Sequence, residues 1–103
     1  MFAVIYSFSV KPGQTSKFIE AWEELTRLIY THEGSLGSRL HKTNASEFMA
    51  YAQWPDKKTW QESGKKLPDE ADKWRNAMRL ACDSIETRFE LPVVSDFLKK
   101  ETF

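Results

Sequence analysis

The segment that most restricts the fold lies at the start of the chain. In residues 2–10, FAVIYSFSV, bulky side chains occupy every second position, and small or apolar side chains lie between them. A period of two, in residues that favour extended backbone, predicts a strand. Neither face of this strand carries a charge, so we expect it to lie in the middle of a sheet and to be covered on both sides.

Two apolar stripes at helical period predict the main helices. The first, in a helix of about residues 15–31, consists of Phe18, Trp22, Leu25 and Ile29. The second, in a helix of about residues 70–82, consists of Ala71, Trp74, Met78, Ala81 and Cys82. Each stripe is expected to face the sheet. A shorter helix, capped by Asp56 and reaching about Glu62, is predicted between them.

Three further strands complete the pattern. Residues 36–42 and 47–54 are separated by a short polar loop, which predicts a hairpin. Residues 84–91 alternate, and we expect one face to hold Ile85, Thr87, Phe89 and Leu91 and the other Glu86, Arg88 and Glu90. The order β-α-β-β-α-β predicts an α+β, ferredoxin-like domain, in which helices cover one face of an antiparallel four-stranded sheet.

The uncovered sheet face predicts a homodimer. Its residues would be Ala3, Ile5 and some of Met49, Tyr51 and Trp54. An apolar face is costly to expose to water, and a second sheet packed on it would remove that cost. We expect one domain over residues 1–103, because the chain is too short for two cores. Residues 92–103 would form a C-terminal tail that packs on the domain or on the partner subunit, through Val93, Val94, Phe97, Leu98 and Phe103.

Composition excludes several classes of function. Fifteen Lys and Arg balance fifteen Asp and Glu, whereas nucleic-acid-binding proteins carry a basic excess. One cysteine and two histidines do not predict a metal site. No apolar run approaches the roughly 20 residues of a membrane span. The first residues lack the basic segment and cleavage site of a signal peptide, so we expect a cytoplasmic protein with no membrane partner.

Four segments, taken in order, are similar to segments of a known family. They are Val10–Gly13 at the end of the first strand, His32–Leu36 after the first helix, Phe48–Trp54 in the hairpin, and Trp54–Trp60. The sequence in this order resembles the antibiotic biosynthesis monooxygenase superfamily of dimeric α/β barrels. The resemblance covers roughly residues 2–91, nearly the whole expected domain.

The resemblance implies an oxygenase that needs no cofactor, with its ligand between the sheet and the helices of each subunit. The superfamily also contains haem-degrading members, but this sequence has Tyr6, Gly64 and Trp74 near the positions of their functional Asn, Trp and His. We therefore expect a monooxygenase of a small phenol-like or hydroquinone-like substrate, without metal or cofactor. A non-catalytic ligand-binding or stress-related module on the same dimeric barrel is the alternative, so enzymatic activity stays open.

Two polar side chains are candidates for catalysis. Tyr6 would face the helices, where its hydroxyl needs a partner or a cavity, and it could bind a phenolic ligand and help to remove its proton. His41 shares a strand face with Arg39, so the imidazole could act as a base while the guanidinium holds an anion. Alternatively, Tyr6 bonds backbone in a filled core, and the other two pair with Glu86 or Glu90 at the dimer seam or on the surface.

Aromatic side chains are the candidates for substrate binding. They make up 14% of the chain, and Trp22, Trp60 and Trp74, together with Met78, could enclose a flat substrate. The alternative is an aromatic core, which the same helical spacing would produce. Three tryptophans on three helices above one small sheet are difficult to pack without a gap, and this favours a pocket.

Overall fold

The computed structural model describes residues 1–98. Its elements are β1 (Phe2–Val10), α1 (Thr15–His32), β2 (Gly37–Lys42), β3 (Glu47–Trp54), α2 (Lys57–Gln61), α3 (Glu70–Ala81) and β4 (Cys82–Pro92). The strands form one sheet in the order β2-β3-β1-β4, and each neighbouring pair is antiparallel. The predicted ferredoxin-like α+β fold is therefore confirmed, with β1 in the interior of the sheet.

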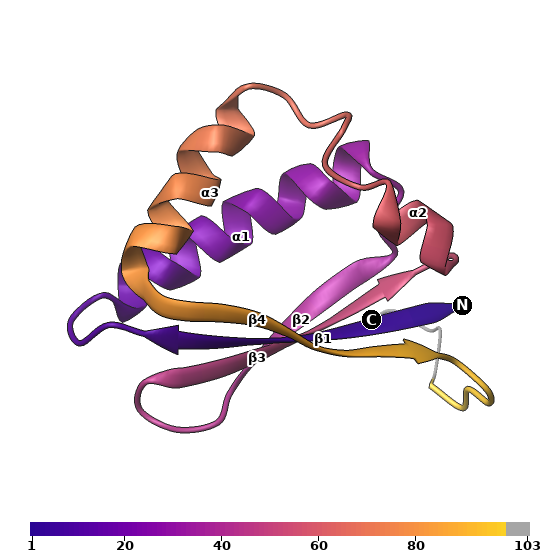
Figure 1. The fold of residues 1–103 in the computed structure, drawn as a ribbon, viewed down its shortest axis with the longest axis horizontal. Helices are drawn as coiled ribbons and strands as arrows, with labels where there is room; N and C mark the ends of the chain where they lie inside the picture. Colours follow the sequence, from indigo (N-terminus) through magenta and orange to yellow (C-terminus); the bar gives the residue numbers. More distant parts are fainter. Residues whose placement is uncertain (99–103) are drawn as a thin grey trace.

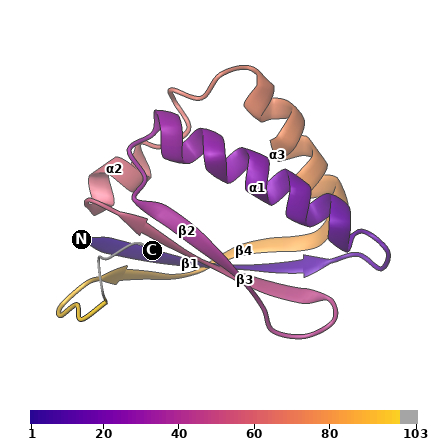
Figure 2. The same cartoon turned by 180° about the vertical axis from the view of Figure 1, so that it is seen from behind.

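The three helices lie on the same side of the sheet. Figure 1 shows α1 and α3 above the strands and α2 near one end of the sheet. The view from behind shows the same arrangement, in which no described segment forms a helix on the opposite face (Figure 2). Within residues 1–98, no helix has the length and apolar character that crossing a membrane requires.

The core lies between the sheet and α1. Phe18 of α1 has no exposed surface and packs between Phe8 and Phe48, with ring centroids 5.0 and 5.2 Å away. A second buried cluster, toward the other end of the sheet, contains Phe2, Val4, Ala52 and Trp54. Burial of each large apolar side chain contributes about 1.5–3 kcal/mol, so these two clusters fix α1 on the sheet.

Asp56 begins α2, as the sequence predicts. Its carboxylate accepts a hydrogen bond from the backbone N–H of Thr59 at 2.7 Å. This N–H lowers the pKa of Asp56 below its usual range, because it stabilises the ionised carboxylate. The cap fixes the start of the helix that carries Trp60.

A β-bulge in β4 corrects the predicted alternation of that strand. Tyr6 of β1 lies opposite Thr87, whereas the preceding Ile5 lies opposite Phe89, so Arg88 is the extra residue. Residues before the bulge keep the predicted faces, but Phe89 and the residues after it change sides. The expected single apolar face is therefore wrong, because Phe89 and Leu91 lie on the uncovered face of the sheet. Glu90 lies on the helix side, where its carboxylate is 3.4 Å from the ammonium of Lys57.

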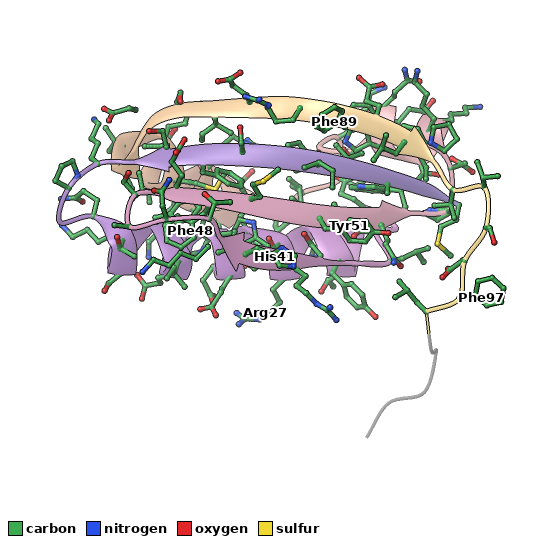
Figure 3. All side chains as sticks on the ribbon, turned by 90° about the horizontal axis from the view of Figure 1, so that it is seen from below. Arg27, His41, Phe48, Tyr51, Phe89 and Phe97 are labelled. Carbon is green, nitrogen blue, oxygen red and sulfur yellow. The ribbon has the colours of Figure 1, made fainter. Side chains whose placement is uncertain are left out.

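The uncovered face is apolar at one end. It carries Ala3, Ile5, Met49 and Tyr51, while Trp54 belongs to the helix-side core. Phe89 and Leu91 extend this apolar area to the edge at β4, and they are 54% and 43% exposed. Figure 3 looks onto this face and shows Phe89, Tyr51 and His41 on three different strands.

The C-terminal tail also leaves apolar side chains exposed. The N–H of Val93 donates to the carbonyl of Met1 at 3.0 Å, which ties the start of the tail to the sheet. Beyond it, Val94 is 96% and Phe97 is 97% exposed, so these two side chains do not pack on their own domain. Contact with a partner subunit stays a prediction, and Phe103 lies outside the described residues.

Candidate functional site

A cavity of about 160 Å³ lies between the sheet and helices α1 and α3. Its wall is mostly apolar and contains Tyr6, Phe8, Trp22, Leu25, Thr26, Ile29, Ser35, Ser38, Ala52, Trp54, Met78 and Ile85. An apolar cavity with a few polar groups is the usual form of a small-molecule site. The position on the helix side of the sheet agrees with the place at which the sequence predicts a ligand.

Tyr6 supplies a polar group to this cavity. Its hydroxyl oxygen accepts a hydrogen bond from the indole N–H of Trp60 at 2.7 Å. Burial raises the pKa of Tyr6, with a smaller increase from the Glu90 carboxylate, while the bond from Trp60 acts in the opposite direction. The hydroxyl is therefore neutral at physiological pH. Within residues 1–98 it donates no hydrogen bond, so its proton is available to an acceptor in the cavity.

Trp54 supplies a second donor, which the sequence analysis missed. This side chain is only 3% exposed, and it lines the same cavity. Its indole nitrogen is buried and has no hydrogen-bond partner within the described part of the chain. A buried donor without a partner costs about 1–3 kcal/mol, and such a group in a native fold calls for an explanation. An acceptor atom on a bound ligand would satisfy it.

The predicted aromatic residues divide into three groups. Trp22 and Met78 line the cavity. Trp60 lies behind Tyr6, where it packs against Phe2 with ring centroids 5.8 Å apart. Trp74 does not line the cavity, and the ammonium of Lys73 lies 4.5 Å from its ring centroid. We therefore leave Trp74 out of the site that we propose below.

His41 and Arg39 lie on the other face of the sheet. They pair with Met49 and Tyr51 across β2 and β3, so they point away from the helices (Figure 3). Both are exposed, and Nδ1 of His41 is 3.4 Å from the carbonyl oxygen of Met49. The sheet itself separates them from the cavity of their own subunit. They do not meet the carboxylates with which the sequence could pair them.

Those carboxylates have other partners in the described chain. Glu86 lies 3.7 Å from Arg88, and Glu90 lies 3.4 Å from Lys57. The expected common face for Glu86, Arg88 and Glu90 is wrong, because the bulge places Glu86 and Glu90 on opposite sides of the sheet. Of these two carboxylates, that of Glu86 shares the uncovered face with His41.

The remaining reactive groups do not form a second site. Cys82 is buried, and burial raises the pKa of its thiol to about 11, so it is a neutral core side chain at physiological pH. Within residues 1–98, no three His, Cys, Asp or Glu side chains are grouped as metal ligands. Glu33 is buried, and its carboxylate accepts the backbone N–H of Lys66 at 2.8 Å, which holds the loop after α2.

Comparison with known proteins gives one family and a set of similar folds. The family model described as antibiotic biosynthesis monooxygenase matches residues 1–79. No curated protein matches the sequence. Among solved structures, SnoaB, a cofactor-independent oxygenase from Streptomyces nogalater, has a TM-score of 0.76 at 12% identity, over 95% of this chain and 97% of that one.

Two further structures have the same fold. A protein of unknown function from Nitrosomonas europaea has a TM-score of 0.74 at 15% identity, over 97% of this chain and 95% of that one. A conserved protein from Bacteroides thetaiotaomicron, described as a possible oxidoreductase, has a TM-score of 0.68 at 19% identity, over 87% of this chain and 96% of that one. At such low identities the similarity establishes the fold.

Proposed function

This chain belongs to the antibiotic biosynthesis monooxygenase family, and we propose that it transfers one atom of molecular oxygen to a small phenol or hydroquinone bound in the cavity between the sheet and helices α1 and α3. The observation that carries the proposal is that Tyr6 and Trp54 both line one apolar cavity, and that the O–H of Tyr6 and the N–H of Trp54 have no acceptor within residues 1–98. The printed description of SnoaB as a cofactor-independent oxygenase supports the same class of reaction.

The two donors suit a substrate oxygen that becomes negatively charged. A phenol reacts with oxygen as its phenolate, because the anion gives up an electron far more readily. Hydrogen bonds from Tyr6 and Trp54 would stabilise that anion in a cavity whose wall is mostly apolar. Because Tyr6 is neutral, its role in this proposal is to donate a hydrogen bond to the phenolate oxygen and not to act as a base.

The reaction balances without a further reductant. A phenol with hydrogen at the para carbon reacts with O₂ to give a para-quinone and water, and a hydroquinone with hydrogen on another ring carbon gives a hydroxy-para-quinone and water. One oxygen atom forms the new C–O bond, and the other leaves as water with the two hydrogens lost from the substrate. The four electrons that reduce O₂ come from the substrate itself.

The substrate proton leaves through solvent in this proposal. No carboxylate, imidazole or amine lines the cavity, and His41 lies beyond the sheet. The protein contributes by lowering the pKa of the bound phenol and by holding the ring among Trp22, Trp54 and Met78. Rate enhancement would come from binding, orientation and stabilisation of the anion.

Oxygen uptake tests the proposal directly. Purified protein is mixed with a panel of single-ring phenols and hydroquinones in the presence of a chelator, and oxygen consumption is compared with the spontaneous rate. We expect uptake above that rate, and we expect Trp54→Phe, which keeps an aromatic ring but removes the N–H, to lower it several-fold. Binding of the phenols without any enhanced uptake would instead support the non-catalytic ligand-binding module.

We also propose that the working form is a homodimer, and that it is cytoplasmic. The uncovered sheet face exposes Phe89 and Leu91, and the tail exposes Val94 and Phe97. A second copy of this chain, packed sheet against sheet, would cover the first pair and give the tail a surface on which to pack.

A further inference from the structure

We propose that the substrate is a single aromatic ring with an anionic substituent, and that Arg75 and Arg79 bind the anion in a groove that adjoins the cavity. This inference depends on the proposed function, because it specifies which phenols the same site takes. It adds two properties that can be tested apart from turnover, namely the number of rings and the charge of the ligand.

The volume of the cavity limits the ring system. About 160 Å³ is close to the roughly 150 Å³ of an engineered apolar cavity that holds one benzene molecule. Two fused rings would require the large side chains in the wall, Trp22 and Trp54 among them, to move apart. Protein interiors resist such movement, so a single ring is the better fit.

A groove on the outer surface continues from the cavity. It lies between α1, α3 and the start of β4, has a volume of about 500 Å³, and shares Leu25, Met78 and Ile85 with the cavity wall. Because these three side chains line both spaces, they form the boundary between the cavity and the groove, which a ring substituent would have to cross. The groove can therefore hold the part of the substrate that the cavity cannot.

The charges along this groove favour an anion. Arg75 and Arg79 of α3 both line it, against one lining carboxylate, that of Asp83. Arg75 also donates to Asp72 at 2.9 Å, whereas Arg79 has no ion pair within residues 1–98. A guanidinium binds a carboxylate or phosphate through two parallel N–H groups, and this matches an acidic substituent.

A second groove, on the other side of α1, has a different balance of charge. It is lined by Glu23, Arg27 and Tyr30 and also borders the cavity, with which it shares Trp22 and Thr26. Here Arg27 is already paired with Glu24, and Glu23 adds a further negative charge. This groove therefore offers no net attraction to an anion, and its arginine provides a matched control.

The test uses three phenols that do not oxidise readily. The first two, 3-hydroxyphenylacetate and 3-hydroxyphenylacetamide, keep the para carbon free, have nearly the same shape and differ in charge, and the third, 6-hydroxy-2-naphthoate, has two fused rings. Dissociation constants are measured by calorimetry at low salt. We expect the acetate to bind about two- to fivefold more tightly than the amide, as for a solvent-exposed ion pair, and the naphthoate to bind at least about tenfold more weakly than the acetate.

Substitutions assign the effect to its residue. Arg79→Gln should reduce the preference for the acetate over the amide, with Arg75 left to bind the anion, whereas Arg27→Gln should keep the preference in full. Because Arg79 also lies in the last turn of α3, where a cation suits the helix dipole, melting temperatures of both variants separate a structural effect from a binding effect.

Each outcome decides a different point. Equal binding of the acetate and the amide by the unmodified protein, or loss of the preference in Arg27→Gln, would overturn the anionic substituent. Tight binding of the naphthoate would overturn the single ring. Failure of all three phenols to bind would overturn the proposed function together with this inference, so the two failures are distinguishable.

Discussion

At the scale of single residues, Tyr6 is a hydrogen-bond donor whose surroundings keep it neutral. Burial raises the pKa of Tyr6 above its usual range, and this outweighs the hydrogen bond that its oxygen accepts from Trp60. Its proton is therefore retained throughout the physiological range. A bound phenolate would receive that hydrogen bond. The pH dependence of the rate would therefore come from ionisation of the substrate.

Replacing Tyr6 by phenylalanine tests this pH dependence. In the unmodified protein, donation from Tyr6 stabilises bound phenolate relative to bound phenol, so the substrate ionises at a lower pH than it does in solution. Without the donor, we expect the rising part of the rate–pH profile to move upward by about half to one pH unit, which corresponds to one hydrogen bond. Oxygen uptake between pH 6 and pH 9 measures it.

His41→Ala is the control for that measurement. The imidazole lies on the uncovered sheet face, so the profile of this variant should match that of the unmodified protein. A shift in His41→Ala, combined with no shift in Tyr6→Phe, would mean that the site lies on the other side of the sheet.

Trp54 marks the limit of sequence reasoning at this scale. Its place at the end of an alternating strand is readable, as is the presence of Tyr6 on the bulky face of the first strand. Whether an indole N–H finds a partner depends on how β3, α1 and the loops around them meet, and no local pattern carries that information. The exclusion of His41 from the cavity is a similar case, because residue type alone does not say which face of the sheet holds the ligand.

At the scale of elements, the apolar stripe of α1 serves two purposes. Phe18 is fully buried between two other phenylalanine rings, whereas Trp22, one turn later, is half-buried and lines the cavity. The helical period predicts both as core residues and does not distinguish them. Only the position of the cavity separates a residue that holds the fold together from one that faces a ligand.

Alanine substitutions should separate these two roles. Phe18→Ala removes a ring from a filled core and should destabilise the domain by about 3–5 kcal/mol. Trp22→Ala removes a side chain that already borders a cavity, so we expect a smaller loss of stability and a larger loss of phenol binding. Urea unfolding and calorimetric titration of the two variants measure these effects. If Trp22→Ala lost as much stability as Phe18→Ala, Trp22 would be a packed core side chain that leaves no room for a ligand.

The bulge in β4 is the element-level feature that alternation could not predict. The sequence of residues 84–91 alternates without interruption, and no glycine or proline marks the extra residue. A bulge of this kind is specified by pairing with β1, because the partner strand decides which residue is left unpaired. Helices and strands are recognised from local periodicity in the sequence, so their order was predictable. The side of the sheet on which Phe89 lies depends on pairing with β1, so it was not predictable.

At the scale of the whole molecule, the bulge enlarges the face that a partner would cover. Residues opposite one another across the four strands form rows, and one row consists of Arg39, Tyr51, Ile5 and Phe89. The row beside it consists of His41, Met49, Ser7 and Glu86. The first row is apolar in its centre, and a face-to-face dimer would bury it, with a total interface above roughly 1,200 Å² if it is stable.

Phe89→Lys should therefore produce a monomer. It places a charge within the proposed contact, where desolvation would oppose association and where Arg39, in the same row, carries the same charge. Leu80→Lys is the matched control, because Leu80 is 73% exposed on α3, away from the sheet face. Sedimentation velocity at micromolar concentration should show a dimer for the unmodified protein and for Leu80→Lys. A dimer that survives Phe89→Lys would mean that another surface forms the contact.

The charges at the two edges of this face select one way of pairing the sheets. Arg39 and His41 lie on β2, at one edge, and Glu86 lies on β4, at the other. A two-fold axis parallel to the strands places β2 of one subunit on β4 of its partner, so His41 faces Glu86. An axis across the strands would instead place β2 on β2, and the basic side chains would face their own copies, which is unfavourable. We therefore expect the first arrangement.

Exchanging the two charges distinguishes the arrangements. The dimer has two seams, each formed where β2 of one subunit meets β4 of its partner. His41→Glu alone places two carboxylates together at each seam. We expect it to weaken the dimer by roughly 2- to 30-fold, the range for two exposed ion pairs. Adding Glu86→Lys to the same chain should restore association, because each seam again holds opposite charges. If β2 packed on β2, the double variant would remain weak, and His41→Glu would instead form mixed dimers with the unmodified protein. Sedimentation equilibrium of the single variant, the double variant and the mixture measures all three.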